Sequence, residues 1–140
     1  MQKIHFYFHD RKPSLKERKK LKKVIENLFS AERKRLGTLA YIFCSDKYLL
    51  EINKGFLKHD FYTDVITFDL SETSKEIIGE VYISIDRIKE NAKHMEVSFK
   101  EELHRIIFHG ALHLCGYNDK TKTEIAIIRG KEDKYLKKHF

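Results

Sequence analysis

Two histidines and the residues that follow them form the part of the sequence best suited to chemistry. His109 and His113 are four residues apart, and residues with this spacing lie on the same face of a helix, about one turn apart. Imidazole nitrogens bind zinc at about 2.0–2.1 Å. On a helix, the pair therefore offers two nitrogen ligands to one metal ion.

A third ligand follows a glycine. Gly116 can turn the chain left-handed without steric strain, so the residues after it can fold back and bring Asp119 to the same point. Three protein ligands leave a fourth position open, which distinguishes catalytic zinc sites from structural ones. A metal held there can acidify a bound water or polarise a phosphoryl oxygen. We predict that His109, His113 and Asp119 bind one divalent metal ion.

The resulting pattern, H-x-x-x-H-x-x-G-x-x-D, is similar to the zinc-protease signature H-E-x-x-H-x-x-G-x-x-H. Gly110 stands where the protease has a glutamate, the general base of peptide hydrolysis. A metalloprotease-like hydrolase is therefore kept only as an alternative. Cys44 and Cys115 are interpreted as packing residues, and Cys115 would point away from His113 on a continuing helix.

Hydrophobic periodicity predicts the elements that must position these residues. Alternating or continuous apolar residues over 4–8, 39–44, 65–68 and 77–85 indicate four strands, with Gly79 at a bulge. Helical spacing or capping patterns begin at Ser14, Ser45, Asp86, Ser98 and Thr121. The second helix is expected to end at Gly55 and the last near Leu136. The fold class is therefore α+β, with a single mixed β-sheet of about four strands covered by about five helices, in one domain over residues 1–140.

Composition indicates a basic globular protein. Among 140 residues, Lys and Arg number 28 and Asp and Glu number 21, which gives a net charge of +7. This surplus favours an anionic partner, most commonly nucleic acid. No segment reaches the ~18 apolar residues of a membrane helix, and the first residues lack the apolar core of an export signal. We therefore expect a cytoplasmic protein with reduced thiols and no membrane partner.

Three blocks of sequence resemble one known family. His109-Gly110-x-Leu112-His113-Leu114-x-Gly116-Tyr117 is similar to the signature H-G-x-L-H-L-x-G-Y-D-H of the YbeY family. Residues 63–68 resemble its T-D-V-L-S-F block, with Ile52-Asn53 upstream matching its L-N, and residues 79–84 resemble its G-D-I-x-I-S block. The resemblance implies a single-strand-specific, metal-dependent endoribonuclease that acts in maturation of the 3′ end of small-subunit ribosomal RNA and in ribosome quality control. It also implies a zinc ion, and ribosomal RNA and the small ribosomal subunit as partners.

Two positions depart from the family pattern. Asp119 occupies the slot of the third ligand, which is usually histidine, and Asn118 replaces the aspartate before it. Leu57, followed by Lys58, occupies the slot of an arginine, which would hold a phosphate by two bonds where a lysine offers a point charge.

Several roles stay open at this stage. The catalytic residues are unknown, and the carboxylates available as general base are Asp64, Glu80 and Glu102. Phe56, Phe61 and Tyr62 either stack on bases or pack in the core. The basic runs 19–23 and 33–35 either contact phosphates or form solvated helix faces. A second alternative function is a non-catalytic ribosome-assembly factor with a structural metal. The oligomeric state is unknown.

Overall fold

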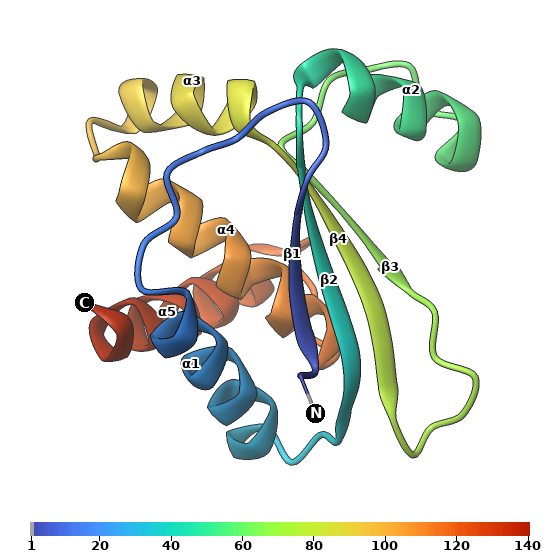
Figure 1. Cartoon of the computed structure of the whole chain (residues 1–140), viewed down its shortest axis with the longest axis vertical. Coiled ribbons are helices and arrows are strands. Elements are labelled where there is room, and N and C mark those ends of the chain that lie inside the picture. The colour runs from blue at the N-terminus through green and yellow to red at the C-terminus, as the bar shows by residue number, and fades with distance from the viewer. Residues whose placement is uncertain (1) are drawn as a thin grey trace.

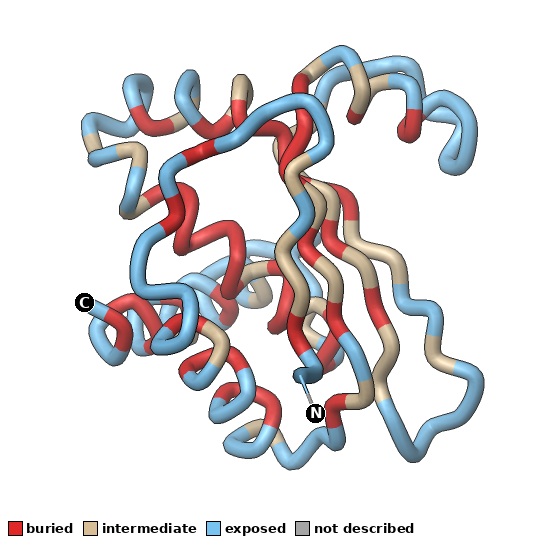
Figure 2. Tube along the Cα trace, in the orientation of Figure 1, coloured by how far each residue is buried: buried red, intermediate tan, exposed pale blue. Residues whose placement is uncertain are grey.

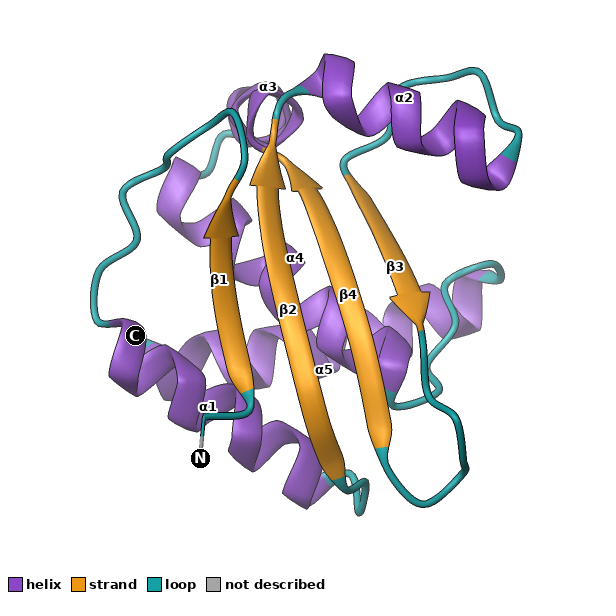
Figure 3. Cartoon of the chain, turned by 45° about the vertical axis from the view of Figure 1, so that its right-hand side comes forward, coloured by secondary structure: helices purple, strands orange, loops and turns teal. Residues whose placement is uncertain are grey.

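A single open sheet forms the centre of the computed structural model, which describes residues 2–140. Its strands are β1 (Ile4–Phe8), β2 (Leu36–Cys44), β3 (Val65–Asp69) and β4 (Ile77–Ser84). They lie in the order β1-β2-β4-β3 (Figure 3), with β1, β2 and β4 parallel and β3 antiparallel to β4. β2 is therefore central, and β3 is an edge strand.

Five helices complete the fold: α1 (Arg18–Ala31), α2 (Asp46–Leu57), α3 (Ile85–Met95), α4 (Phe99–Leu114) and α5 (Lys122–His139). Figure 1 shows α1, α3, α4 and α5 on one side of the sheet and α2 on the other. The expected α+β class, with one mixed sheet of four strands and five helices, is confirmed. Within residues 2–140, no helix has the length and apolar character needed to cross a membrane.

The main core lies between the sheet and α4. Alternate residues of the central strands point to this side, and Tyr41 of β2 and Val81 of β4 are 0% exposed. The middle and end of α4 are red in Figure 2 because nearly every residue there is buried. Between Glu102 and Leu114, the residues that are not buried are His109 and His113. Over this stretch, the core thus fixes the helix everywhere except at the two predicted ligands.

Two glycines let α4 approach β4 closely. A Cβ atom on Gly110 would lie 2.7 Å from Cγ1 of Val81, and one on Gly79 would lie 2.6 Å from Cδ1 of Leu114. In a close-packed interior such overlaps force neighbouring atoms to move. The two positions therefore set how near the histidine-bearing helix lies to the sheet.

The first helix begins later than the capping pattern predicts. It starts at Arg18 rather than near Ser14, after Glu17 with φ 52° and no side-chain cap. Leu15 is 6% exposed, because the segment before the helix packs without helical structure against the core. The apolar residues of the helix, spaced three and four apart, are all buried: Leu21, Val24, Ile25, Leu28 and Phe29.

Other boundaries also differ from expectation. Gly55 does not end α2, which continues to Leu57 and stops at Lys58 with φ 57°. Gly79 is not at a bulge, because its pairing with β2 is regular and the irregularity lies between Leu36 and Thr38. The expected caps are confirmed at three helix starts, where the side chains of Ser45, Ser98 and Thr121 each accept a bond from a backbone N–H. α3 begins at Ile85 and not at Asp86, because Ser84 is its cap, and α5 continues past Leu136 to His139.

Candidate metal centre

The last turns of α4 carry the two predicted histidine ligands. Their rings are neighbours, with centroids 4.6 Å apart and planes at 81° to each other. The side chain of His109 is 14% exposed and that of His113 is 26% exposed. The spacing of four residues therefore places two partly open imidazoles on one face of the helix, as predicted.

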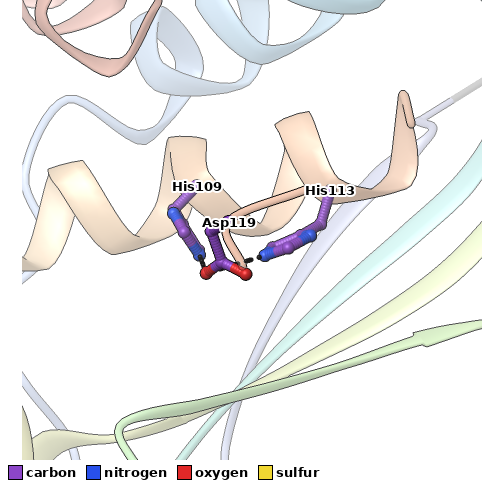
Figure 4. A group of neighbouring side chains, drawn as sticks. All are labelled: His109, His113 and Asp119. Atoms are coloured by element: carbon purple, nitrogen blue, oxygen red, sulfur yellow. Dashed lines mark ion pairs between the residues drawn. The ribbon is translucent and has the colours of Figure 1, made fainter. Parts of the chain in front are cut away.

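The chain reverses immediately after α4. Gly116 has φ +106°, a conformation that disfavours any side chain. The N–H groups of Gly116 and Tyr117 donate to the carbonyl oxygens of His113 and Leu112 at 3.0 and 3.1 Å. These two bonds form the Schellman motif that closes many helices. The reversed chain brings Asp119 back beside both histidines (Figure 4).

The three predicted ligand residues therefore converge. Oδ2 of Asp119 lies 3.3 Å from Nε2 of His109 and 3.4 Å from Nε2 of His113. Donors held at about 2.0–2.1 Å from a tetrahedral ion are about 3.3 Å from one another, so the observed spacing suits an ion between them. Two imidazoles and a carboxylate are also a donor set that suits zinc. Among the residues that the structure describes, this is the group of three donors close enough to hold an ion.

A buried carboxylate from α5 holds the first histidine. Nδ1 of His109 lies 2.6 Å from Oε2 of Glu132, whose side chain is 5% exposed. Arg105 donates to Oε1 of Glu132 at 3.0 Å and to Oδ1 of Asp133 at 2.6 Å. Because a carboxylate can only accept, the bond to His109 places a proton on Nδ1 and leaves the lone pair of Nε2 for a metal.

The same contacts set the protonation of His109 in the metal-free protein. Burial lowers the pKa of this imidazole, but the hydrogen bond and charge of Glu132 raise it, with further help from Asp119 and Asp64. The net result is a raised pKa. A proton and a metal ion compete for the same Nε2 lone pair, so acid is expected to weaken metal binding.

An open cleft of about 840 Å³ lies in front of the three ligand residues. Its walls are residues of β3 and the segment before it, of α3 and α4, and of α5 together with the loop that carries Asp119. The side of the ligand group that faces the cleft therefore has room for a substrate.

Two of the three carboxylates named from the sequence line this cleft. Burial raises the pKa of Asp64, and burial with the nearby charge of Asp64 raises the pKa of Glu102. Nδ2 of Asn91 donates to Oδ2 of Asp64 at 3.2 Å. Glu80 is not in the cleft, because its Oε1 accepts a bond from Tyr82 at 3.0 Å on the other side of the sheet.

The cationic residues of the cleft are not those that the sequence suggested. Arg105 and Arg129 line it, whereas Lys58 and the basic runs 19–23 and 33–35 supply none of its lining among the described residues. Arg105 is held by Glu132 and Asp133, but Arg129 is exposed and makes no ion pair within residues 2–140. Arg129 is therefore able to hold an external anion.

Sequence reasoning missed the contribution of α5 to the site. The residues of this helix that line the cleft are Ile125, Ile128, Arg129 and Glu132. The last three follow Ile125 by three, four and seven residues, a spacing that is typical of one helix face. Two charged residues on an otherwise apolar face were the signal that could have identified them.

A polar contact joins the loop of the site to α1. The hydroxyl of Tyr117 donates to Oε1 of Glu32 at 2.6 Å, and Nζ of Lys131 donates to Oε2 at 3.1 Å. Burial raises the pKa of Glu32, but these two bonds and the lysine charge outweigh it and lower the pKa. The return loop is thus fixed at its start by a charged partner outside the cleft.

The structure also gives a reason for the missing protease glutamate. Position 110 faces Val81 of β4 at a distance that leaves no room for a side chain. A glutamate there would enter the core and not the cleft.

Cys44 and Cys115 are buried free cysteines, and burial raises the pKa of both thiols to about 12, which agrees with a packing role.

Fold and site together define a class: an α+β domain in which an H-x-x-x-H helix and a return loop present three donors at an open cleft. Residues 6–139 match a family model described as Endoribonuclease YbeY. The chain belongs to the YbeY family.

Individual relatives agree with this assignment. Endoribonuclease YbeY of Cytophaga hutchinsonii is 46% identical over 133 residues, which cover 95% of this chain and 93% of the relative. Endoribonuclease YbeY of Flavobacterium psychrophilum is 50% identical over 113 residues, which cover 81% of this chain and 80% of the relative. The solution structure of a Thermotoga maritima protein superimposes with a TM-score of 0.59 at 28% identity, covering 97% of this chain and 88% of that one.

Proposed function

We propose that this chain is a metal-dependent endoribonuclease specific for single-stranded RNA. In this proposal it matures the 3′ end of small-subunit ribosomal RNA, contributes to ribosome quality control and works in the cytoplasm as one domain over residues 1–140. Its partners are ribosomal RNA and the small ribosomal subunit. The observation that carries the proposal is the convergence of His109, His113 and Asp119, at 3.3 and 3.4 Å, on an open cleft. The names of the relatives supply the reaction class.

We assign one zinc ion to His109, His113 and Asp119. When bound, the ion supplies a Lewis acid for a phosphoryl oxygen and lowers the pKa of a water. Glu132 orients His109, and Asp119 contributes a negative charge where the family usually has a neutral histidine. That charge is expected to strengthen ion binding and to make the bound water less acidic.

The proposed proton acceptor is one of the two cleft carboxylates. Asp64 and Glu102 both have raised pKa values, and a carboxylate is a better general base as its pKa approaches the working pH. Arg129 lines the cleft, which supports a role in holding a phosphate of the strand. In this assignment Lys58 has no role at the scissile phosphate, because it lies outside the cleft.

Cleavage of a purified RNA tests the proposal. A single-stranded RNA containing the small-subunit 3′ end is incubated with the parent, with His109→Ala, and with His5→Ala as the matched histidine control on β1. We expect the parent and His5→Ala to cut internally and His109→Ala to be inactive. Equal cleavage by all three proteins would identify a contaminant and reject the proposal. A cyclic 2′,3′-phosphate on the product would show attack by the RNA hydroxyl and not by water.

Chelation separates this function from that of an assembly factor with a structural metal. In a catalytic site, metal removal stops cleavage and leaves the circular dichroism spectrum unchanged. In a structural site it unfolds the protein. We expect the first result, because the core between α4 and the sheet does not involve the three ligand residues. Unfolding on chelation would favour the assembly factor.

A further inference from the structure

A second, smaller hollow adjoins the cleft at β3. It has a volume of about 270 Å³ and lies between the end of α2, the segment that follows it and β3. Thr63, Val65 and Thr67 line both this hollow and the cleft. Because β3 is the edge strand (Figure 3), a chain bound in the cleft can cross it and continue into the hollow.

Two exposed rings form one wall of this hollow. His59 and Phe61 stack with centroids 5.1 Å apart and planes at 19°. Phe61 is 55% exposed. The sequence left core packing open for Phe61, and its exposure excludes that role. An exposed, nearly parallel pair of rings beside an open hollow offers a flat apolar surface to a ligand.

The buried residue Asn53 holds the backbone of both aromatic residues in place. Asn53 is 1% exposed. Its backbone carbonyl accepts from the N–H of His59 at 3.0 Å, and its Nδ2 donates to the carbonyl oxygen of Phe61 at 2.9 Å. The two aromatic residues are therefore fixed at both ends of a short segment, which lowers the conformational entropy lost when a ligand stacks on them.

Positive charge lies on the same segment. Lys58 directly precedes His59, is exposed, and forms no ion pair within residues 2–140. Lys54 is also exposed, although its Nζ lies 3.4 Å from Oδ1 of Asp60. Aromatic side chains next to unpaired lysine are the combination that binds single-stranded nucleic acid, with the rings under the bases and the charge near the backbone.

We propose that His59 and Phe61 form a subsite for one unpaired nucleobase of the RNA strand that the cleft cuts. The proposal rests on the proposed function and extends it, because a base can reach these rings only when it is not paired. The subsite therefore gives a physical source for a single-strand preference. The continuity with the cleft through Thr63, Val65 and Thr67 favours an RNA base over a protein side chain as the occupant.

Binding of short oligonucleotides tests the subsite. The probes are single-stranded 2′-O-methyl RNAs, which resist cleavage, and the same sequence as a duplex. We expect Phe61→Ala to weaken single-strand binding about tenfold, and Phe61→Trp to restore it. Tyr7→Ala is the matched control, since Tyr7 is 53% exposed on β1 at the opposite edge of the sheet. Its affinity should equal that of the parent.

Strands that lack one base make the test specific. For the parent, removal of one particular base should weaken binding about as much as Phe61→Ala does, whereas for Phe61→Ala the same removal should have little further effect. If Phe61→Ala binds and cuts single strands as the parent does, the subsite is wrong and the nuclease function stands. If the parent binds no RNA, both proposals are wrong. Additive losses from the variant and the missing base would also reject the subsite.

Discussion

Nδ1 of His109 lies 2.6 Å from Oε2 of Glu132, so a ligand on α4 takes its orientation from a carboxylate on α5. Glutamine at position 132 keeps the size of the side chain but removes the charge. We expect Glu132→Gln to bind zinc about 10- to 100-fold more weakly, because partners of this kind fix the tautomer and basicity of the ligand. Competition with a chelating dye measures the affinity.

The matched control for this prediction is Asp133→Asn. Asp133 also binds Arg105 but does not contact a histidine. It should bind zinc as the parent does. Equal zinc affinity in Glu132→Gln and the parent, with both folded, would show that the orientation of His109 does not depend on α5.

The contact between Gly110 and Val81 makes a prediction about stability. A Cβ at position 110 would lie 2.7 Å from Cγ1 of Val81, so Gly110→Ala is expected to destabilise the fold by about 1–3 kcal/mol. Gly130→Ala is the control, because no atom lies within 4 Å of its Cβ position in the interior of α5. That change should stabilise by about 0.5–1 kcal/mol. Urea denaturation compares the variants. A double variant Gly110→Ala, Val81→Ala that loses less stability than the sum of the two single variants would identify the contact.

A buried histidine predicts how stability depends on pH. Burial lowers the pKa of His104 to about 4, from the ordinary value of 6.5. Above pH 6.5 the side chain is neutral in both states, so it causes no pH dependence. Below pH 6.5 the unfolded chain takes up a proton that the folded chain refuses, and stability falls until the folded pKa is reached.

The size of this effect can be isolated by substitution. At pH 5 the His104 contribution is about 2 kcal/mol. We expect His104→Phe, which can pack beside His139 and Phe140, to lose about 2 kcal/mol less than the parent between pH 7 and pH 5. Urea titrations at the two pH values give the comparison. An identical loss in both proteins would mean that His104 is protonated in the folded state.

The exposed cation of the cleft predicts a change in salt dependence. Arg129 lines the cleft and makes no ion pair within the described residues. If Arg129 holds a phosphate, Arg129→Ala should weaken the binding of every RNA sequence to a similar extent. It should also lower the slope of log affinity against log salt concentration by about one. Lys137→Ala, an exposed lysine of the same helix outside the cleft, should leave the slope unchanged. A slope that does not change in Arg129→Ala would remove this residue from the phosphate site.

The convergence of His109, His113 and Asp119 could be predicted because the pattern that brings them together is local. His109, His113, Gly116 and Asp119 lie within eleven residues, and helix geometry with one left-handed turn is enough to place them together. Glu132 and Arg129 could not be placed in the same way. Their position depends on how α5 packs against α4, and no local pattern contains that contact.

The same distinction explains the errors in the fold. The capping pattern at Ser14 is locally sound, but Leu15 packs into the core from a segment that is not helical, and the helix begins only at Arg18. Gly79 was interpreted as a bulge because a glycine inside a strand often marks one. Its reason is Leu114 of α4, which occupies the space of the missing side chain. Strand order, too, is a property of the whole sheet.

The bond from Tyr117 to Glu32 links the return loop to the end of the first helix, 85 residues earlier in the chain. An alteration that loosens this helix, such as a bulky amino-terminal fusion or a truncation, is therefore expected to shift the return loop. Asp119 and any ion that it holds would move with the loop. If the three residues hold an ion, the content of bound metal is expected to report damage at the end of α1, which is outside the ligand group. Preparations that differ only at their amino-terminal tag should accordingly be compared for bound metal before they are compared for activity.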